Sequence, residues 1–232
     1  MMIYITCDTH GDFRRIKSFC REKGTKKGDI LIILGDAGIN IRGGEEDREK
    51  KENLEALPIT IFAIHGNHEN RPYNIRTYKE KIWYGGMVYY EEAYPHILFA
   101  QDGEIFDFDG KKNIVIGGAY SIDKDIRLKY GWNWWKDEQP SEAVRRYVES
   151  RLKQSDWKID VVLSHTVPAK YEPIECFLPE IDQSSVDKST EIWLDSIEDR
   201  LDYRKWYCGH YHTEKQVDKL EFMFENIELF SV

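Results

Sequence analysis

The sequence contains no apolar run that approaches the roughly 20 residues needed to span a bilayer. Its first β-rich stretch begins at about Met2, so we expect no signal peptide ahead of it. These two absences argue against a membrane partner and against export. We therefore expect a cytoplasmic protein.

Cysteine is scarce, and its spacing carries no motif. The four cysteines, Cys7, Cys20, Cys176 and Cys208, include no C-x-x-C pair. Because no export signal is expected, we predict reduced thiols and no disulfides. Cys7 and Cys208 lie at the ends of apolar runs, and we expect both to point away from the neighbouring polar loops and to pack as small buried hydrophobic residues.

Positively charged residues are fewer than negatively charged ones. The chain has 33 Lys and Arg against 42 Asp and Glu, which gives a formal net charge of −9. A surface that holds nucleic acid by its phosphates needs clustered Lys and Arg, so this balance disfavours such a surface. Nucleic acid is not excluded as a substrate, because bound dications reverse the local sign of a site.

The composition is otherwise that of a folded globular protein. Of 232 residues, 41 % are hydrophobic and 13 % aromatic, with seven tryptophans, despite 32 % charged residues. This length is typical of one large α/β domain, so we predict a single domain over residues 1–232.

Residues 2–64 alternate apolar runs with helical patterns. Buried strands are predicted over Met2–Cys7, Asp29–Leu34 and Ile59–Ile64. A helix with Asp12 as its N-cap is expected to end before Gly24, and a second is expected over Glu45–Leu57. This βαβαβ order predicts a parallel unit.

From residue 70 the period changes. Glu104–Phe108 and Asn113–Gly118 flank Asp109-Gly110, a hairpin signal, so antiparallel strands either join the first sheet or begin a second one. Residues 121–140 predict a loop with three tryptophans. Further on we expect helices over Ser141–Leu152 and Thr190–Leu201, strands over Ile159–Leu163 and Lys205–Cys208, and two or three antiparallel strands over Glu214–Val232.

Five apolar runs end in side chains of the kinds that bind metals. These side chains are Asp8 with His10, Asp36, Asn67, His165, and His210 with His212. In open α/β sheets, sites form outside the carboxyl ends of the strands, so these five loops should meet at one point. The spacing of two within D-T-H and H-Y-H places both ligands on one side of an extended backbone. The pattern predicts a metal centre.

Seven ligands are too many for one ion that must also admit a substrate, so two divalent ions that share a carboxylate fit better. Imidazole, carboxylate and amide ligands suit Mn²⁺, which we expect, or iron or Zn²⁺. We expect His65 and His96 to be structural or surface residues.

The motifs D-x-H, G-D, G-N-H-E, a lone histidine and G-H-x-H follow one another over Asp8–His212. This order resembles the calcineurin-like metallophosphoesterases. The resemblance implies an α/β fold in which a two-sheet β-sandwich is flanked by helices, an αββα arrangement with two ions at its edge. Matched by position, it assigns Asp8, His10 and His212 to the first ion, Asn67, His165 and His210 to the second, Asp36 to a bridge, and His68 to the catalytic histidine.

The chain departs from the protein phosphatase branch of that family, which continues G-D-x-x-D-R. The last two positions here are Ile39 and Asn40. The aspartate that supports the histidine and the arginine that holds phosphate are therefore missing, which counts against a Ser/Thr protein phosphatase.

Other side chains are candidates for the missing phosphate contact. Arg42, Arg71 and Arg127 could supply it, although an ordinary exposed arginine is the more common alternative for each. Trp134 could stack on a base, with Lys124 or Arg127 meeting phosphate, or its loop could simply cap the sheet edge.

The residues and the resemblance imply the same chemistry. Two ions roughly 3.5–4 Å apart can hold a bridging hydroxide in line with a phosphorus, and His68 can protonate the leaving oxygen as general acid. We therefore expect a metal-dependent phosphoesterase that hydrolyses a small phosphomonoester or phosphodiester, with a nucleotide as one candidate. The alternatives are a nuclease or protein phosphatase of the same superfamily, and an inactive metal-binding scaffold.

Overall fold

The first three predicted strands lie side by side in one parallel sheet. In the computed structural model, which describes residues 1–231, β1 (Ile3–Thr6), β2 (Ile30–Ile33) and β3 (Thr60–Ala63) pair in parallel. Helices α1 (Arg14–Lys23) and α2 (Gly44–Glu55) connect them. The predicted βαβαβ order is confirmed.

The region where the sequence period changes supplies strands to both of the sheets in the fold. The seven-stranded sheet runs in the order β13 (Glu228–Leu229), β1, β2, β3, β6 (Tyr94–Ala100), β5 (Gly86–Glu91) and β4 (Tyr78–Trp83). The six-stranded sheet runs in the order β11 (Lys215–Val217), β12 (Leu220–Phe222), β10 (Lys205–Cys208), β9 (Val161–Ser164), β8 (Lys111–Ile116) and β7 (Ile105–Phe108). β7 and β8 form the predicted antiparallel hairpin and lie in the second sheet, whereas β4 and β5 extend the first.

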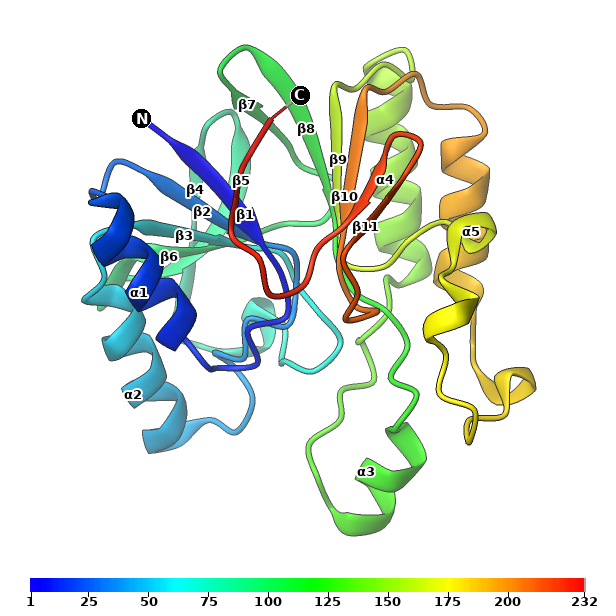
Figure 1. Cartoon of the computed structure of the whole chain (residues 1–232), viewed down its shortest axis with the longest axis horizontal. Helices are drawn as coiled ribbons and strands as arrows, with labels where there is room; N and C mark the ends of the chain where they lie inside the picture. The colour runs from blue at the N-terminus through cyan, green and yellow to red at the C-terminus, as the bar shows by residue number, and fades with distance from the viewer. Residues whose placement is uncertain (232) are drawn as a thin grey trace.

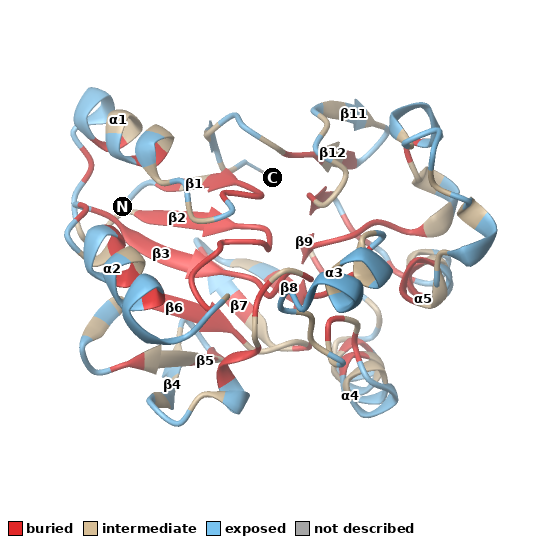
Figure 2. Cartoon of the chain, turned by 90° about the horizontal axis from the view of Figure 1, so that it is seen from below, coloured by how far each residue is buried: buried red, intermediate tan, exposed pale blue. Residues whose placement is uncertain are grey.

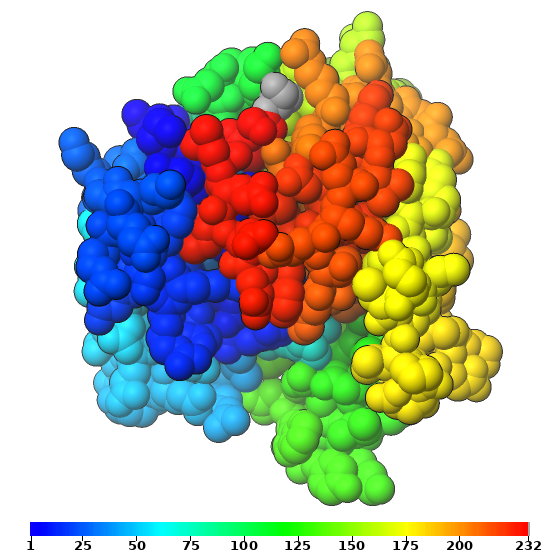
Figure 3. Space-filling view, in the orientation of Figure 1, coloured from blue at the N-terminus to red at the C-terminus, as the bar shows by residue number. Residues whose placement is uncertain are grey.

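The C-terminal segment joins the two sheets. β12 pairs in parallel with β10 and antiparallel with β11, and β13 then pairs antiparallel with β1 in the other sheet. Figure 3 shows this red segment lying between the blue N-terminal strand region and the orange strands of the second sheet. The expected antiparallel strands are therefore present, but the pairing of β12 with β10 is parallel; Val232 lies outside the described residues.

Three apolar layers hold four layers of structure together (Figures 1 and 2). Ile5, Ile32 and Phe62 face the second sheet and pack there with its inner residues, such as Val115 and Leu163. The intervening residues of the same strands, such as Leu31 and Ile61, pack instead under Ile16 of α1 and Leu54 of α2. This alternation follows from the two-residue period of a strand.

The outer face of the second sheet is covered in the same way. Trp206 of β10 and Val162 of β9 pack against Val148 of α4 (Glu142–Gln154) and Leu194 of α5 (Ser189–Glu198). Two facing sheets with helices on their outer sides confirm the predicted αββα fold. No helix within residues 1–231 combines the length and the apolar character needed to cross a membrane.

Helix ends agree only in part with the predictions. Gly24 ends α1 in the left-handed conformation, and Ser141 caps α4 by accepting a hydrogen bond from the backbone N–H of Val144. The N-cap position of α1 is occupied by Phe13, not by the predicted Asp12. The Asp12 carboxylate nevertheless accepts a hydrogen bond of 3.1 Å from the backbone N–H of Arg14, the first residue of the helix, and also pairs with the exposed Arg14 side chain. Residues 1–231 also contain four short 3₁₀ turns: η1 (Pro72–Asn74), η2 (Ala169–Tyr171), η3 (Ile174–Cys176) and η4 (Gln183–Ser185).

Residues 121–140, which we call the arm, contain the helix α3 (Lys124–Tyr130) where a loop was predicted. Each residue of α3 is at least partly exposed. Figure 1 shows α3 projecting from the body of the protein on the side to which the strand-end loops of the first sheet lead.

Candidate metal centre

All seven predicted ligands come together at the edge shared by the two sheets. Asp8, Asp36 and Asn67 follow the neighbouring strands β1, β2 and β3, while His165 and His210 follow the neighbouring strands β9 and β10. Because parallel neighbours end at the same edge, the loops of each sheet lie together, and the sandwich brings the two sets face to face.

The first cluster comprises Asp8, His10 and His212. Nε2 of His10 lies 3.1 Å from Nε2 of His212, and Oδ1 of Asp8 lies 3.4 Å from the same His212 nitrogen. The His10 and His212 side chains are 39 % and 49 % exposed, and a cleft of about 780 Å³ opens beside Asp8 and His10. This cluster is therefore accessible to a ligand from solvent.

The second cluster, Asn67, His165 and His210, lies deeper. Oδ1 of Asn67 is 2.8 Å from Nε2 of His165 and 3.1 Å from Nδ1 of His210. Nδ1 of His165 lies 2.7 Å from the carbonyl oxygen of Leu34. A proton on that nitrogen donates to the carbonyl and leaves Nε2 unprotonated, which is the form that binds a metal.

Asp36 lies between the two clusters. Its Oδ2 is 4.0 Å from Nδ1 of His10 and 3.8 Å from Nε2 of His165. Its Oδ1 accepts a hydrogen bond of 2.9 Å from the backbone N–H of His68. One carboxylate thus faces both candidate ion positions.

The backbone of these loops is strained. Five of the seven candidate ligands have positive φ angles: Asp8, His10, Asp36, His210 and His212. Residues other than glycine adopt this conformation uncommonly, and such residues cluster at functional sites, where the surrounding structure maintains the strain.

Two glycines allow the close approach of the ligands. A Cβ at Gly66 would lie 2.0 Å from Oδ1 of Asp36, and a Cβ at Gly209 would lie 1.7 Å from Sγ of Cys7 and 2.8 Å from Oδ2 of Asp8. A side chain at either position would push a carboxylate out of place.

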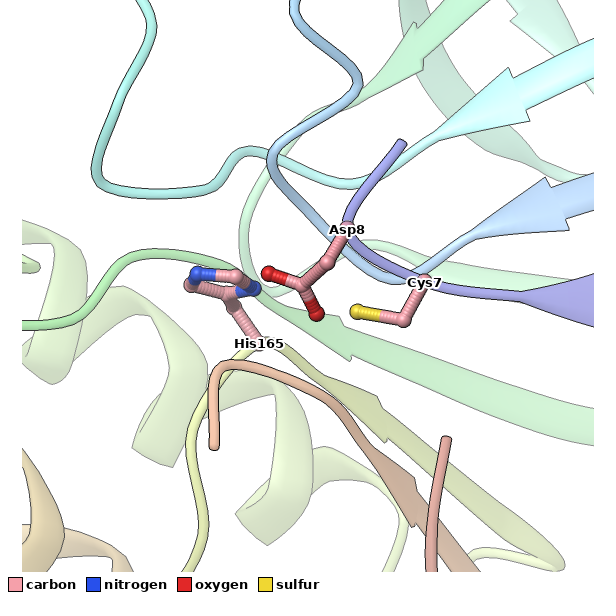
Figure 4. Close-up of side chains that lie close together, drawn as sticks. All are labelled: Cys7, Asp8 and His165. Atoms are coloured by element: carbon pink, nitrogen blue, oxygen red, sulfur yellow. The ribbon is translucent and has the colours of Figure 1, made fainter. Parts of the chain in front are cut away.

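Cys7 does not point away from the site, contrary to the prediction. Figure 4 shows its thiol, the Asp8 carboxylate and the His165 ring turned toward one another, and their ligand atoms lie within 4.8 Å. The strand β1 ends at Thr6 and Asp8 has φ +46°, so side-chain alternation does not continue through Cys7. Burial raises the pKa of the Cys7 thiol well above its usual value, and Sγ donates to the carbonyl oxygen of Leu34 at 3.0 Å. Cys7 is therefore a protonated packing residue beside the site, and Cys208 is buried in the outer core as expected.

The charge states suit a cation. Burial disfavours the ionised carboxyl groups of Asp8 and Asp36, but contacts with His212 and His165 for Asp8, and the charges of His165 and His68 for Asp36, outweigh burial and lower both pKa values. Burial lowers the pKa of His210 to about 3, which keeps its ring neutral. Oδ1 of Asp8 is buried without a hydrogen-bond partner among residues 1–231. Anionic carboxylates, the neutral ring of His210 and an unpartnered oxygen fit divalent metal ions.

His68 lies beside this centre. Its ring centroid is 6.0 Å from that of His10, and its Nε2 is 3.2 Å from Nδ2 of Asn67. Nδ1 of His68 is buried without a partner among the described residues, and burial lowers the pKa of the ring.

Comparison with known proteins identifies the family. A model of the calcineurin-like phosphoesterases matches residues 1–214, which include every candidate ligand. The chain belongs to the calcineurin-like phosphoesterase family. Membership supports a metal-dependent hydrolase of phosphoric esters.

The similar solved structures share little sequence identity with the chain. The chain is similar to TT1561 of Thermus thermophilus, with 12 % identity over 96 % of this chain and 87 % of that one and a TM-score of 0.49. It is also similar to the protein of unknown function AQ665 from Aquifex aeolicus, with 16 % identity over 74 % and 81 % of the two chains and a TM-score of 0.37. No curated protein matches it.

The two positions at which this calcineurin-like phosphoesterase departs from the protein phosphatase pattern have structural roles. Ile39 is buried in the core beneath α1 and α2. The Asn40 side chain exchanges hydrogen bonds with the hydroxyl of Tyr78. The partners of both side chains are therefore residues of the fold itself.

Two residues that support the centre had no predicted role. Glu69 is fully buried, and its carboxyl oxygens accept hydrogen bonds from the backbone N–H groups of Gly66 and Gly38, which ties the loops of Asn67 and Asp36 together. Ser121 of the arm accepts a hydrogen bond from Nδ2 of Asn67 at 2.9 Å. Glu69 could have been suspected from its place after His68, but no signal in the sequence pointed to Ser121.

The four candidate substrate contacts fall into two groups in the structure. Arg71 is only 5 % exposed and is held by Oδ2 of Asp102 at 2.6 Å and by the carbonyl oxygen of Asp137. Trp134 donates to Oε2 of Glu138 at 2.7 Å and lies under Nζ of Lys124. Both side chains therefore already have partners within the fold, and their roles as substrate contacts stay predictions.

Arg42 and Arg127, in contrast, line one open groove. The two remaining histidines are structural or superficial, as expected: His65 is buried, and His96 is partly exposed and 2.6 Å from Glu55.

Proposed function

We propose that the chain hydrolyses phosphoric monoesters or diesters with a pair of divalent ions. Asp8, His10 and His212 would hold the first ion, Asn67, His165 and His210 the second, and Asp36 would bridge them. The observation that carries this assignment is the position of the Asp36 carboxylate, whose Oδ2 lies within 4.0 Å of a histidine nitrogen from each cluster. The donor set favours Mn²⁺, with iron or Zn²⁺ as alternatives.

The ions, when bound, supply activation of water for attack on phosphorus and neutralise charge on the phosphoryl oxygens. The chain supplies the positioning of the other groups. Asp36 holds the backbone of His68, and Asn67 contacts its ring, so the imidazole is kept at the edge of the centre.

His68 acts as the general acid. As the bond from phosphorus to the incoming water oxygen forms and the bond to the leaving oxygen breaks, the imidazolium gives its proton to the leaving oxygen. The attacking water loses a proton to solvent, and His68 is reprotonated before the next turnover. A positioned acid of this kind contributes typically 10²–10⁴-fold to the rate.

The test uses metal-free protein to which Mn²⁺, Fe²⁺ or Zn²⁺ is added. We expect two ions per chain by elemental analysis, and metal-dependent hydrolysis of 4-nitrophenyl phosphate or its bis ester. Comparison of the two esters fixes the ester class, and single-stranded DNA tests for a nuclease. Two bound ions without hydrolysis of any ester would establish a metal-binding scaffold, and a single ion would overturn the bridging role of Asp36.

A further inference from the structure

A groove of about 500 Å³ lies between the arm and the loop that follows β2. Its walls are Ile41 and Arg42 from the loop, and Arg127, Gly131, Trp132 and Asn133 from the arm. Nδ2 of Asn133 donates a hydrogen bond to the carbonyl oxygen of Ile41, which ties the two walls together. We call this the arm groove. Its size is that of a small-molecule site.

The walls of the arm groove are connected to the loops that carry the candidate ligands. Its loop wall follows Asp36 in the chain, and the carbonyl oxygen of Asn40 accepts a hydrogen bond of 2.7 Å from the backbone N–H of Asn70, two residues after His68. On the arm side, Ser121 accepts a hydrogen bond of 2.9 Å from Nδ2 of Asn67, the neighbour of His68 in the chain. Both walls of the groove are therefore tied by hydrogen bonds to the loop that carries Asn67 and His68.

Both charged residues that line the arm groove are arginines. Arg42 is paired with Glu46 at 3.1 Å, and Arg127 with Asp123 at 2.8 Å, but neither carboxylate lines the groove. The exposed pair of Arg42 contributes little stability, so Arg42 can exchange its partner for a phosphate. In a chain of net charge −9, a groove lined by two guanidinium groups selects an anion.

The arm groove is also lined by an exposed aromatic side chain. Trp132 is 59 % exposed, and its ring is 5.8 Å from that of Tyr130, whose side chain is also exposed. A large aromatic face left open beside two arginines matches a flat ring that carries phosphate, because base stacking on an aromatic side chain and charge pairing act at the same time.

We propose that the arm groove binds the leaving group of the substrate, and that this group is a nucleoside bearing a second phosphate. Its base packs on Trp132, and its second phosphate lies between Arg42 and Arg127. The inference rests on the proposed function, and it replaces Trp134, which faces Glu138, with Trp132. A neighbouring hollow of about 700 Å³ shares Ile41, Arg42 and Asn133 with the groove, but it is also lined by the carboxyl groups of Asp47 and Glu91 and is therefore less suited to an anion.

Inhibition constants test this without knowledge of the natural ester. Ribose 5-phosphate, adenosine 5′-monophosphate and adenosine 3′,5′-bisphosphate are measured as competitive inhibitors of whichever nitrophenyl ester the Mn²⁺-loaded protein hydrolyses. We expect the base to tighten inhibition about tenfold, the low end of the range for stacking on one aromatic side chain. The second phosphate should tighten it about tenfold again.

Two variants should each remove one step of this series. Trp132→Ala should abolish the difference between ribose 5-phosphate and the monophosphate, and Arg42→Gln the difference between the monophosphate and the bisphosphate. The matched controls are Leu128→Ala, an exposed apolar residue of the same arm, and Arg146→Gln, an exposed ion-paired arginine on α4. Both controls should retain both steps.

The outcomes separate this inference from the proposed function. Equal inhibition by the three compounds in the unmodified protein, with nitrophenyl ester hydrolysis intact, overturns the nucleotide assignment alone. If no ester is hydrolysed with any metal, the proposed function fails. Calorimetric titration with adenosine 3′,5′-bisphosphate then still tests whether the arm groove binds a nucleotide. Binding that Trp132→Ala and Arg42→Gln weaken supports the inference, and absence of binding overturns it. Tighter binding of single-stranded DNA than of the bisphosphate would replace the small nucleotide with a nucleic acid.

Discussion

The amide nitrogen of Asn67 donates a hydrogen bond of 2.9 Å to Oγ of Ser121, so the arm holds one of the candidate metal ligands in place. This bond leaves Oδ1 of Asn67 directed at His165 and His210. The arm is therefore part of the centre as well as a wall of the arm groove.

Ser121→Ala should weaken binding of the second ion. Without the hydroxyl, the Asn67 amide can rotate, and loss of such a partner typically costs about 10–100-fold in metal affinity. Titration of metal-free protein with Mn²⁺, followed by elemental analysis, measures this. Ser150→Ala on the exposed face of α4 is the control. If the Ser121 variant binds the second ion as tightly as the control does, Ser121 has no role in holding Asn67.

Gly66→Ala should displace Asp36. The new methyl group would lie 2.0 Å from Oδ1 of Asp36, where that oxygen accepts from the His68 N–H. We expect loss of at least one ion, and a destabilisation of about 1–3 kcal/mol from overpacking. The control is Gly28→Ala, whose methyl group would meet no atom within 4 Å. Unchanged metal content in the Gly66 variant would mean that Asp36 can move without consequence.

The ligands could be predicted because strand ends are visible in a sequence. β1, β2, β3, β9 and β10 are short runs of buried apolar residues, so the polar residue after each run marks the edge of a sheet. Parallel pairing then places these residues together without knowledge of the loops. The local sequence does not show that β9 and β10 are neighbours in the second sheet. The assignment of His165 and His210 to one ion therefore came from the family resemblance.

Two of the elements that were not predicted, β4 and α3, lack an apolar face directed at the core. In β4, Ile82 is 74 % exposed, so the alternation of its strand does not report burial. The residues of α3 are likewise exposed, and Ile126 and Leu128 face solvent, so no helical period pointed inward. The roles of Arg71 and Trp134 depended on partners, Asp102 and Glu138, that only the folded chain brings near.

Asp36→Asn tests the bridge. The amide keeps an oxygen that can accept from the His68 N–H, so the loop should persist while the negative charge shared by the two ions is lost. We expect less than one tightly held ion per chain and loss of almost all hydrolysis of nitrophenyl esters. If elemental analysis still finds two ions, the bridge lies elsewhere.

Glu191 on α5 should make stability depend on pH. It is 4 % exposed; Oε1 accepts from the Thr166 hydroxyl at 2.7 Å, and Oε2 has no partner among residues 1–231. Burial raises the pKa of this carboxyl group from 4.5 to about 7. Between these values the folded protein retains a proton that the unfolded chain has released, so the free energy of unfolding falls as the pH rises through this window.

Glu191→Gln should remove that loss. Relative to the unmodified protein, the variant should gain roughly 3 kcal/mol of unfolding free energy between pH 4.5 and 7.5, because one pKa unit corresponds to about 1.4 kcal/mol. Urea unfolding of the metal-free proteins measures the difference. Glu142→Gln, on an exposed side chain of α4, should follow the unmodified protein at every pH. Parallel curves for all three proteins would mean that Glu191 ionises normally.

The general acid role of His68 predicts an effect that depends on the leaving group. An alkoxide is a poor leaving group and needs its proton in the transition state, whereas nitrophenolate leaves readily without one. His68→Asn should keep both ions, because His68 contacts the ligands Asp36 and Asn67 but is not itself a proposed ligand. Its kcat should fall by about 10²–10⁴-fold on an alkyl or nucleoside phosphate and by much less on 4-nitrophenyl phosphate.

Metal content and both esters are measured on the same preparations of the variant, so that loss of an ion cannot be mistaken for loss of the acid. A His96→Asn variant, changed at a partly exposed histidine paired with Glu55, is the control and should hydrolyse both esters at the normal rate. If His68→Asn retains its ions and slows both esters equally, then His68 stabilises charge on the phosphoryl oxygens and another group, or water, protonates the leaving oxygen. The arm would then be the place to search for that group, because its Ser121 contacts Asn67, the neighbour of His68 in the chain.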